Sequence, residues 1–337
     1  MQKNKKYNVA LIGAGRMGAR WASIIAISKQ ASLRLVVDKD VALSEQVAKI
    51  HGAASGTNQR AAFGSDIDAV CIVTPHKFLY PLAKEALLAG KHVFVEKPGS
   101  RTESEMRDLI RIAREKRLTL TVGFNYRLFD SLRQAKKIVE NGAIGAVHSV
   151  RIVHGHPGRV GYKKEWRMQK ELAGGGVLMD QGPHVIDLAR WFLEDTITQV
   201  SGVTSNAVWK AEVEDIAVLF LKTNKGKVAS LQVSISEWKP VFSCHIGGEK
   251  GYLSIRGLGR KYGNGESFSV GIYNRKKEVL KEKILRCDPD ADKALTLELG
   301  SFLDALANGV RKNESAEDAA EVLSIIGKVY AQAKELV

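Results

Sequence analysis

The stretch Asn8-Val9-Ala10-Leu11-Ile12-Gly13-Ala14-Gly15-Arg16-Met17-Gly18 decides the fold of this chain. Its first five residues form an apolar run typical of a buried strand, and residues 19–26 are predicted to form a helix. Between them lies the pattern G-x-G-x-x-G, whose glycines allow a tight turn and close approach of a pyrophosphate to a helix N-terminus. We therefore predict a dinucleotide site that includes Gly13, Gly15, Arg16, Met17 and Gly18.

The second predicted strand supports this interpretation. It spans residues 33–38 and ends in Asp38, about twenty residues after the last glycine of the pattern. A carboxylate at that place hydrogen-bonds the ribose 2′-hydroxyl and repels a 2′-phosphate, so the sequence favours NAD over NADP, although the adjacent Lys39 works against that preference. The alternative role for Asp38 is a helix cap, but Asp40 is better placed to cap a helix over residues 41–50.

Strands and helices then alternate. Further strands are predicted over residues 69–73, 92–95 and 118–122, with helices over residues 78–88 and 102–116. Alternation of this kind predicts a parallel, doubly wound sheet of the Rossmann type. Ligands bind beyond the carboxyl ends of such strands, where we expect Gly13, Asp38, Thr74 and Lys97.

The rest of the chain has a different pattern. Strands are predicted over residues 146–153, 200–208, 215–223, 228–236, 242–246, 252–255 and 267–273, and helices over residues 131–141, 291–307 and 316–336. Consecutive strands without helices between them indicate a mostly antiparallel sheet. The predicted fold class is therefore α/β, with an N-terminal Rossmann domain (residues 1–124) and a C-terminal α/β domain built on a large open sheet (residues 125–337).

Composition excludes several classes of protein. The 337 residues are 45% hydrophobic and carry a formal net charge of +14, but the basic residues are dispersed and form no nucleic-acid motif. No apolar run approaches the ~20 residues of a membrane span, and no signal peptide is apparent. Cys71, Cys244 and Cys287 fit no disulfide or zinc framework, and His154 and His156 lack a third ligand nearby. We expect a cytoplasmic protein without a metal and with no nucleic-acid or membrane partner.

A second glycine-rich stretch, Gly174-Gly175-Gly176, precedes a predicted helix. Asp180, His184 and Asp187 follow at i, i+4 and i+7 and would share one face of that helix. An acid and an imidazole at a helix start indicate a reaction site. The alternative is a structural pair that makes a cap or a surface hydrogen bond.

Residues 154–162 are predicted to form a loop, because they contain three glycines and a proline, and Trp166-Arg167 follows soon after. Arginine and tyrosine suit polyol or phosphate recognition. We predict substrate binding by Arg159, Tyr162, Trp166 and Arg167, the alternative being loop contacts and a core tryptophan. The positive charge favours an anionic substrate, such as a nucleotide-linked sugar or a sugar acid.

Together these motifs resemble the glucose–fructose oxidoreductase and inositol dehydrogenase family, Gfo/Idh/MocA. The resemblance covers nearly the whole chain and rests on the glycine pattern, Asp38, Thr74-Pro75, residues 89–98 (AGKHVFVEKP), residues 123–127 (GFNYR), residues 142–145, Trp166-Arg167 and residues 174–187. It implies an NAD(P)-dependent oxidoreductase that acts on sugars, cyclitols or their derivatives. It also implies that the C-terminal domain binds substrate and forms a homodimer or homotetramer through its sheet.

The resemblance also assigns site residues. It maps the catalytic lysine, aspartate and histidine onto Lys97, Asp180 and His184, and it implies a cis Lys97–Pro98 bond. Further cofactor contacts map onto Asp38, Thr74, Pro75, His76, Glu96, Lys97 and Asn125, and further substrate contacts onto Tyr126, Lys97, Asp180 and His184. Members often carry Thr-Pro-Asn-x-x-His where this chain has Thr74-Pro75-His76-Lys77-Phe78-Leu79. His76 therefore either replaces the usual contact near the nicotinamide or caps the turn.

The expected reaction transfers a hydride from a secondary alcohol to nicotinamide. His184 would accept the hydroxyl proton, since imidazole titrates near neutral pH, Lys97 would stabilise charge on the same oxygen, and Asp180 would orient the substrate. A desolvated Lys97 is the alternative base. Two other functions remain open: an enzyme that recycles bound NAD during glycoside cleavage or epimerisation, and a non-turnover NAD(H)-binding regulator.

Overall fold

The computed structural model describes residues 6–259, 262–274, 279–288, 290–309 and 313–335. The chain divides into two compact units, residues 1–124 with 295–323, and residues 125–294 with 324–337. The single boundary expected from the sequence makes no allowance for the return of residues 295–323 to the first unit. Within the described stretches, no helix combines the length and the apolar character needed to cross a lipid bilayer.

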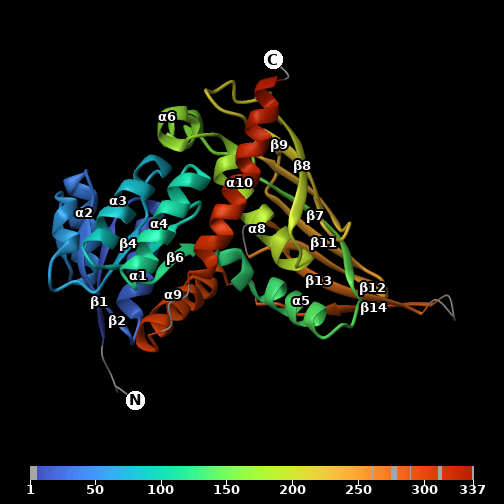
Figure 1. The fold of residues 1–337 in the computed structure, drawn as a ribbon, viewed down its shortest axis with the longest axis horizontal. Coiled ribbons are helices and arrows are strands. Elements are labelled where there is room, and N and C mark those ends of the chain that lie inside the picture. The colour runs from blue at the N-terminus through green and yellow to red at the C-terminus, as the bar shows by residue number, and fades with distance from the viewer. Residues whose placement is uncertain (1–5, 260–261, 275–278, 289, 310–312, 336–337) are drawn as a thin grey trace. The chain divides into compact units, whose positions relative to one another are not determined.

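The first unit is built on a six-stranded parallel sheet of strand order β3-β2-β1-β4-β5-β6 (Figure 1). Its strands are β1 (Tyr7–Ile12), β2 (Ala31–Val37), β3 (Ala54–Gly56), β4 (Ala69–Ile72), β5 (His92–Glu96) and β6 (Leu120–Gly123). Its helices are α1 (Arg16–Ile27), α2 (Val41–His51), the 3-10 turn η1 (Gln59–Phe63), α3 (His76–Leu88) and α4 (Glu103–Glu115). The predicted doubly wound sheet is confirmed, while β3 and η1 are additions that the sequence pattern did not indicate.

Short-range chemistry explains where these helices start. Asp40 accepts hydrogen bonds from the Ala42 and Leu43 amides and so caps α2, as predicted. Thr102 accepts from the Glu105 amide at the start of α4. The Glu105 carboxylate bonds the amide of Arg101 at 2.9 Å, so the predicted capping box closes one residue before Thr102.

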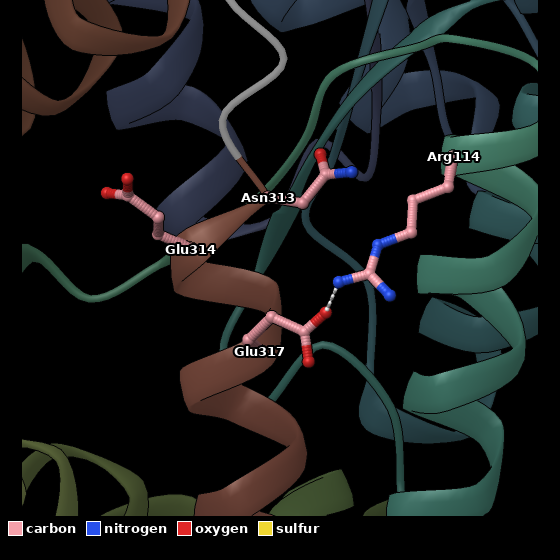
Figure 2. A pocket seen from close by; sticks show the side chains of 4 residues that line it. All are labelled: Arg114, Asn313, Glu314 and Glu317. Carbon is pink, nitrogen blue, oxygen red and sulfur yellow. Dashed lines mark hydrogen bonds and ion pairs between the residues drawn. The ribbon is translucent and has the colours of Figure 1, made fainter.

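The core of the first unit includes the helix α9 (Ala291–Ala307) from Leu295 onward. The buried Trp21 ring lies 4.6 Å from that of Phe94, which also packs against the ring of Phe302 on α9 at 5.8 Å. Further along, α10 (Glu314–Glu335) starts beside α4, where Arg114 pairs with Glu317 at 2.5 Å (Figure 2). The side chain of Asn313 accepts the Leu120 amide at 2.9 Å. Residues 295–323 therefore complete the first unit by packing and by hydrogen bonds.

The second unit is built on an eight-stranded sheet of order β14-β13-β12-β11-β7-β10-β9-β8 (Figure 1). Its strands are β7 (Val147–Gly155), β8 (Ile197–Ser205), β9 (Ile216–Thr223), β10 (Val228–Ser234), β11 (Val241–Gly248), β12 (Gly251–Leu258), β13 (Tyr262–Asn274) and β14 (Val279–Leu285). Among the described strands of this sheet only β7 and β10 pair in parallel, so the predicted mostly antiparallel sheet is confirmed.

The helical elements of the second unit lie mainly between β7 and β8 in the sequence. They are η2 (Asn125–Leu128), α5 (Asp130–Glu140), η3 (Tyr162–Lys164), η4 (Trp166–Met168), α6 (Lys170–Ala173), α7 (Val177–Asp180) and α8 (Gly182–Leu193). The residues of α10 from 324 onward also belong here. Leu336, the predicted end of the last helix, lies outside the described residues.

The predicted strand over residues 200–208 is wrong at its end, because β8 stops at Ser205. The cause is the fully buried Asp215, whose carboxylate accepts the amides of Ala207, Val208 and Trp209 at 2.9, 2.7 and 2.8 Å. These amides point at a side chain and cannot join a strand ladder.

Candidate active site

The glycine-rich turn between β1 and α1 has two packed positions and one open position. A Cβ on Gly13 (φ +104°) would lie 2.4 Å from the Val73 carbonyl oxygen, and a Cβ on Gly18 would lie 1.9 Å from the Gly13 oxygen. Apart from chain neighbours, no heavy atom of the described structure lies within 4 Å of a Cβ built on Gly15. The turn therefore excludes side chains where backbones meet and leaves a free approach at Gly15.

The start of α1 suits a bound anion. In the described structure no side chain caps this helix end, and its first turn has no acidic residue. Asp38, which follows β2, accepts the Ala14 amide through Oδ2 at 2.6 Å and the Asp40 amide through Oδ1 at 3.0 Å. Each carboxylate oxygen keeps a lone pair that a ribose hydroxyl can use. The residues present thus fit a dinucleotide.

The segment after β4 adds a second indication. The Thr74 hydroxyl oxygen is buried and has no hydrogen-bond partner among the described residues. Such a group costs about 1–3 kcal/mol when it stays unsatisfied, so a polar ligand atom beside it would be stabilised. The adjacent His76 is buried as the first residue of α3, with Pro75 at the N-cap.

Glu96 and Lys97 lie at the carboxyl end of β5. Glu96 accepts the indole N–H of the buried Trp21 at 2.7 Å, so one of its contacts joins β5 to α1 within the core. Lys97 is half-buried and precedes a cis peptide bond to Pro98, as the family resemblance implied.

The glycine run of the second unit is explained by close packing. A Cβ on Gly175 would lie 2.0 Å from the Tyr330 hydroxyl, and one on Gly176 would lie 2.0 Å from the Glu214 carbonyl oxygen. The Glu214 carboxylate accepts the amides of Gly176 and Leu178 at 2.9 and 3.1 Å and the Tyr330 hydroxyl at 2.8 Å. Glu214 is therefore the cap of α7, and its burial raises its pKa.

The single helical face expected for Asp180, His184 and Asp187 is wrong. Helix α7 ends at Asp180 and α8 starts at Gly182, because Pro183 has no amide hydrogen with which to continue the first helix. Asp187 has a structural partner: its carboxylate binds the Arg127 guanidinium through two hydrogen bonds of 2.8 and 2.5 Å. Of these three residues, Asp180 and His184 remain candidates for chemistry.

Asp180 is the end of a row of alternating charges. It is buried, accepts the side-chain amide of Gln181 at 2.9 Å, and lies 3.4 Å from Nε of Arg167. The Glu165 carboxylate lies 3.5 Å from Arg167 and 2.5 Å from Arg159. The structure thus brings together three residues that the sequence singled out, through a glutamate that it did not.

Aromatic rings border the same row. The Arg159 and Arg167 guanidinium groups lie over the Tyr162 and Trp166 rings at 4.9 and 4.4 Å. Burial raises the pKa of Tyr162, and the charge of Asp180 adds to the effect. Tyr162 therefore lies close enough to Asp180 for the carboxylate charge to affect it.

His184 is held by Tyr126. The two rings stack at 3.8 Å with an interplanar angle of 7°, and the Tyr126 hydroxyl lies 3.1 Å from Nε2 of His154. Burial raises the pKa of Tyr126, with further contributions from Tyr262 and from the charge of Asp180. Tyr126 thus contacts the His184 imidazole directly, and the negative charge of Asp180 acts on its hydroxyl group.

Several of these residues escaped the sequence interpretation. Gln181 and Glu165 are polar residues adjacent in sequence to predicted site residues, which is a local signal for them. Tyr262, Glu214 and Tyr330 come from distant segments, and the sequence near the predicted site does not indicate them. His154 bonds Tyr126, and no group of three or more His, Cys, Asp or Glu side chains in the described residues is arranged to hold a metal ion.

Comparison with known proteins agrees with both units. Residues 7–124 match the family model described as an oxidoreductase family with an NAD-binding Rossmann fold, and residues 132–254 match the Gfo/Idh/MocA C-terminal domain. The parallel sheet and the glycine-rich turn thus belong to an oxidoreductase family with an NAD-binding Rossmann fold. The two models together cover more than half of the chain, which therefore belongs to the Gfo/Idh/MocA family.

Individual relatives are more distant. The chain is 31% identical over 198 residues to levoglucosan dehydrogenase of Pseudarthrobacter phenanthrenivorans, covering 55% of this chain and 51% of that protein. It is 29% identical over 231 residues to inositol 2-dehydrogenase of Rhizobium meliloti, covering 66% and 67%. The matches thus span half to two thirds of these relatives. A solved levoglucosan dehydrogenase complex with NADH and levoglucosan shares the fold, with a TM-score of 0.90, 24% identity and 98% coverage of both chains.

Proposed function

We propose that this chain is an NAD-dependent dehydrogenase that transfers a hydride between nicotinamide and a secondary alcohol of a sugar or cyclitol. The observation that carries the proposal is the dinucleotide turn, with Gly15 open and Asp38 hydrogen-bonded beside it. The relatives named as levoglucosan and inositol dehydrogenases support the choice of substrate class.

The cofactor would lie on the turn from Gly13 to Gly18, with Asp38 at its ribose and the Thr74 hydroxyl as a further donor. Family resemblance adds Pro75, His76, Glu96, Lys97 and Asn125 to the proposed contacts. When bound, the nicotinamide ring supplies the carbon that accepts the hydride. The chain itself must bind the alcohol, orient it and accept its proton.

Asp180 and His184 are the proposed groups for those tasks. A buried carboxylate accepts a hydrogen bond from a substrate hydroxyl and fixes its direction. His184 accepts the proton of the reacting hydroxyl, and stacking on Tyr126 limits the rotation of its ring. Lys97 is proposed to stabilise the developing alkoxide, and it is the alternative base.

The charges favour a neutral substrate. Arg159 and Arg167 each lie beside the Glu165 carboxylate, and Arg167 also lies beside Asp180. Within this row, the two positive and the two negative charges therefore balance. An anionic substrate would have to compete with Glu165 for both guanidinium groups, whereas a polyol can hydrogen-bond to the row as it stands. We propose a neutral sugar or cyclitol in place of the anionic substrate expected from net charge.

The test is a panel of neutral sugars, cyclitols, sugar acids and nucleotide sugars, assayed with NAD and NADP separately by nicotinamide absorbance. We expect NADH formation with neutral polyols and a loss of at least ~10²-fold in kcat for Lys97→Ala. Product without net NADH would point to recycled cofactor, and NADH binding without any turnover would point to a regulator. Near-normal turnover by Lys97→Ala would remove that residue from the mechanism.

We also propose that the second unit forms a homodimer or homotetramer through its sheet. Alternate residues of β9, Ala217, Leu219 and Leu221, are buried, while Phe220 between them is 58% exposed and Val203 on neighbouring β8 is 56% exposed. Exposed apolar groups on the opposite face suit a second copy. Phe220→Lys should lower the molecular mass measured by light scattering.

The three free cysteines favour a cytoplasmic location, which cell fractionation would test.

A further inference from the structure

The connection from β8 to β9 (residues 206–215) has no part in the function described so far, yet it is unusually well fixed. Asp215 holds three successive amides of the connection, as described above, and the indole N–H of Trp209 donates to the Ile235 carbonyl at 2.7 Å. The side chain of Asn206 also binds both the amide and the carbonyl of Ala211. Trp209 is thus fixed through its backbone and through its ring.

One arm of the connection contacts the predicted substrate loop. Gly158 has φ +73°, and a Cβ built on it would lie only 2.4 Å from Cζ2 of Trp209, so the indole lies directly against the loop backbone. The Trp209 ring also lies 5.6 Å from that of Tyr162. Gly158 and Tyr162 flank Arg159, so both ends of the segment that carries this arginine contact Trp209.

The other arm contacts the helix that ends at Asp180. Glu214 caps α7 through the Gly176 and Leu178 amides, and its own carbonyl accepts the Val177 amide at 3.0 Å. The Asp180 amide in turn donates to the Gly176 carbonyl at 2.9 Å. Only four residues (210–213) separate Trp209 from Glu214, and Asp215, which follows Glu214, accepts the Trp209 amide at 2.8 Å. A shift of one arm would therefore displace the other.

We propose that the β8–β9 connection sets the position of the Arg159–Tyr162 segment relative to Asp180, and that Trp209 is a specificity-determining positioning residue. The proposal rests on the proposed function. Trp209 acts through its contacts with Gly158 and Tyr162 on the segment that carries Arg159, and it touches no reacting atom. A shorter side chain at 209 would let the loop shift, which changes substrate fit more than cofactor binding or the chemical step.

The experiment compares Trp209→Ala and Trp209→Phe with Trp238→Ala, a matched control because Trp238 is 97% exposed in the described structure. For the best substrate of the panel, we expect KM to rise about tenfold in Trp209→Ala, with kcat and NADH affinity within about threefold of the unmodified protein. Trp209→Phe should fall between, and Trp238→Ala should match the unmodified protein. An unchanged KM, or equal losses in KM, kcat and NADH affinity, would overturn the proposal.

Hydrogen exchange tests the same proposal without turnover. In Trp209→Ala the amides of Gly158, Tyr162 and Glu165 should exchange faster, while those of β10 should not, because each of the three amides is hydrogen-bonded within the loop. Unchanged exchange would overturn the positioning role. Faster exchange in a protein that oxidises no sugar or cyclitol would instead support the positioning role while the proposed function failed.

Discussion

Two glycine-rich stretches precede helices in this chain, and they differ in what occupies the helix start. At residues 13–18 the described structure leaves α1 without a side-chain cap and leaves Gly15 open. At residues 174–176 the Glu214 carboxylate already binds the amides of α7, and Tyr330 and Glu214 fill the space beside the glycines. A glycine run before a helix therefore indicates an anion site only where the protein supplies no acid of its own.

Among the changes that test this comparison, Gly18→Ala should have the largest effect on NADH affinity and on folding. Its Cβ would lie 1.9 Å from the Gly13 oxygen, a backbone atom that cannot move without separating α1 from β1. We expect loss of NADH binding by at least ~10²-fold, or failure to fold, because such clashes cost several kcal/mol. Fluorescence titration with NADH measures the loss of binding, and the melting temperature measures the loss of folding. Normal NADH affinity would show that the turn does not hold the cofactor.

Glu214→Ala should be the next largest, because it leaves three buried donors without an acceptor. We expect a loss of about 3 kcal/mol in the free energy of unfolding, measured in urea. Glu214→Gln keeps one acceptor oxygen and should lose less than about 1 kcal/mol at neutral pH. Equal losses in the two variants would mean that the carboxylate charge, and not the acceptor, holds α7.

The same pair of proteins tests the pH dependence. Burial raises the pKa of Glu214 from its ordinary 4.5, so the folded state binds the proton more tightly than the unfolded chain. The resulting stabilisation is fully present below pH 4.5 and is lost as pH rises through the raised pKa. Glu214→Gln should remove that loss from the pH profile of unfolding. An unchanged profile would refute the raised pKa.

Gly15→Ala should separate binding from folding. Its backbone (φ −64°, ψ −171°) is accessible to alanine and its Cβ would meet open space, so the melting temperature should change little. The added methyl group would occupy the approach to the helix start, and NADH affinity should fall about tenfold, or about 1.4 kcal/mol. Unaltered affinity would place the pyrophosphate elsewhere.

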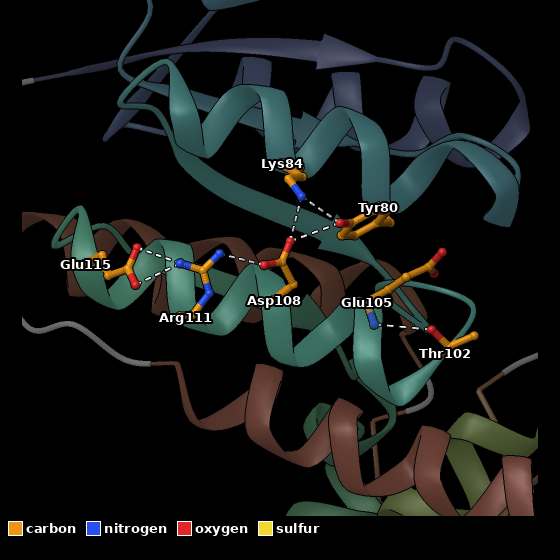
Figure 3. A network of polar contacts seen from close by, with 7 residues as sticks. All are labelled: Tyr80, Lys84, Thr102, Glu105, Asp108, Arg111 and Glu115. Carbon is orange, nitrogen blue, oxygen red and sulfur yellow. Dashed lines mark hydrogen bonds and ion pairs between the residues drawn. The ribbon is translucent and has the colours of Figure 1, made fainter.

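Replacing Asp108 should have the smallest effect on stability, and its pKa is shifted in the opposite direction to that of Glu214. Asp108 lies on the partly exposed face of α4, where it accepts hydrogen bonds from Lys84 and Arg111 (Figure 3). These hydrogen bonds lower the pKa of Asp108 to about 2. Its stabilisation is present above the ordinary pKa of 3.8 and is lost as pH falls toward 2. Asp108→Asn should cost less than about 1 kcal/mol at neutral pH, since exposed ion pairs are weak. A loss as large as that of Glu214→Ala would contradict this.

The sequence predicted those features that depend on neighbours in the chain. The parallel sheet and the caps at Asp40 and Thr102 follow from local patterns, and the structure confirms them. The break between α7 and α8 also had a local signal in Gly182-Pro183, which the spacing of Asp180 and His184 obscured. The cap from Glu214 depends on packing between distant segments, and the end of β8 depends on a side chain six to eight residues further along, which periodicity does not record.

The return of residues 295–323 to the first unit has a consequence for synthesis on the ribosome. Leu299, Phe302 and Leu303 are buried in the same core as Trp21 and Phe94, yet they are made after residues 125–294 of the second unit. When residue 124 leaves the exit tunnel, the first sheet still lacks part of its apolar cover. The first unit therefore acquires its native core only once residues 295–323 have been made, after the strands of the second unit have already emerged.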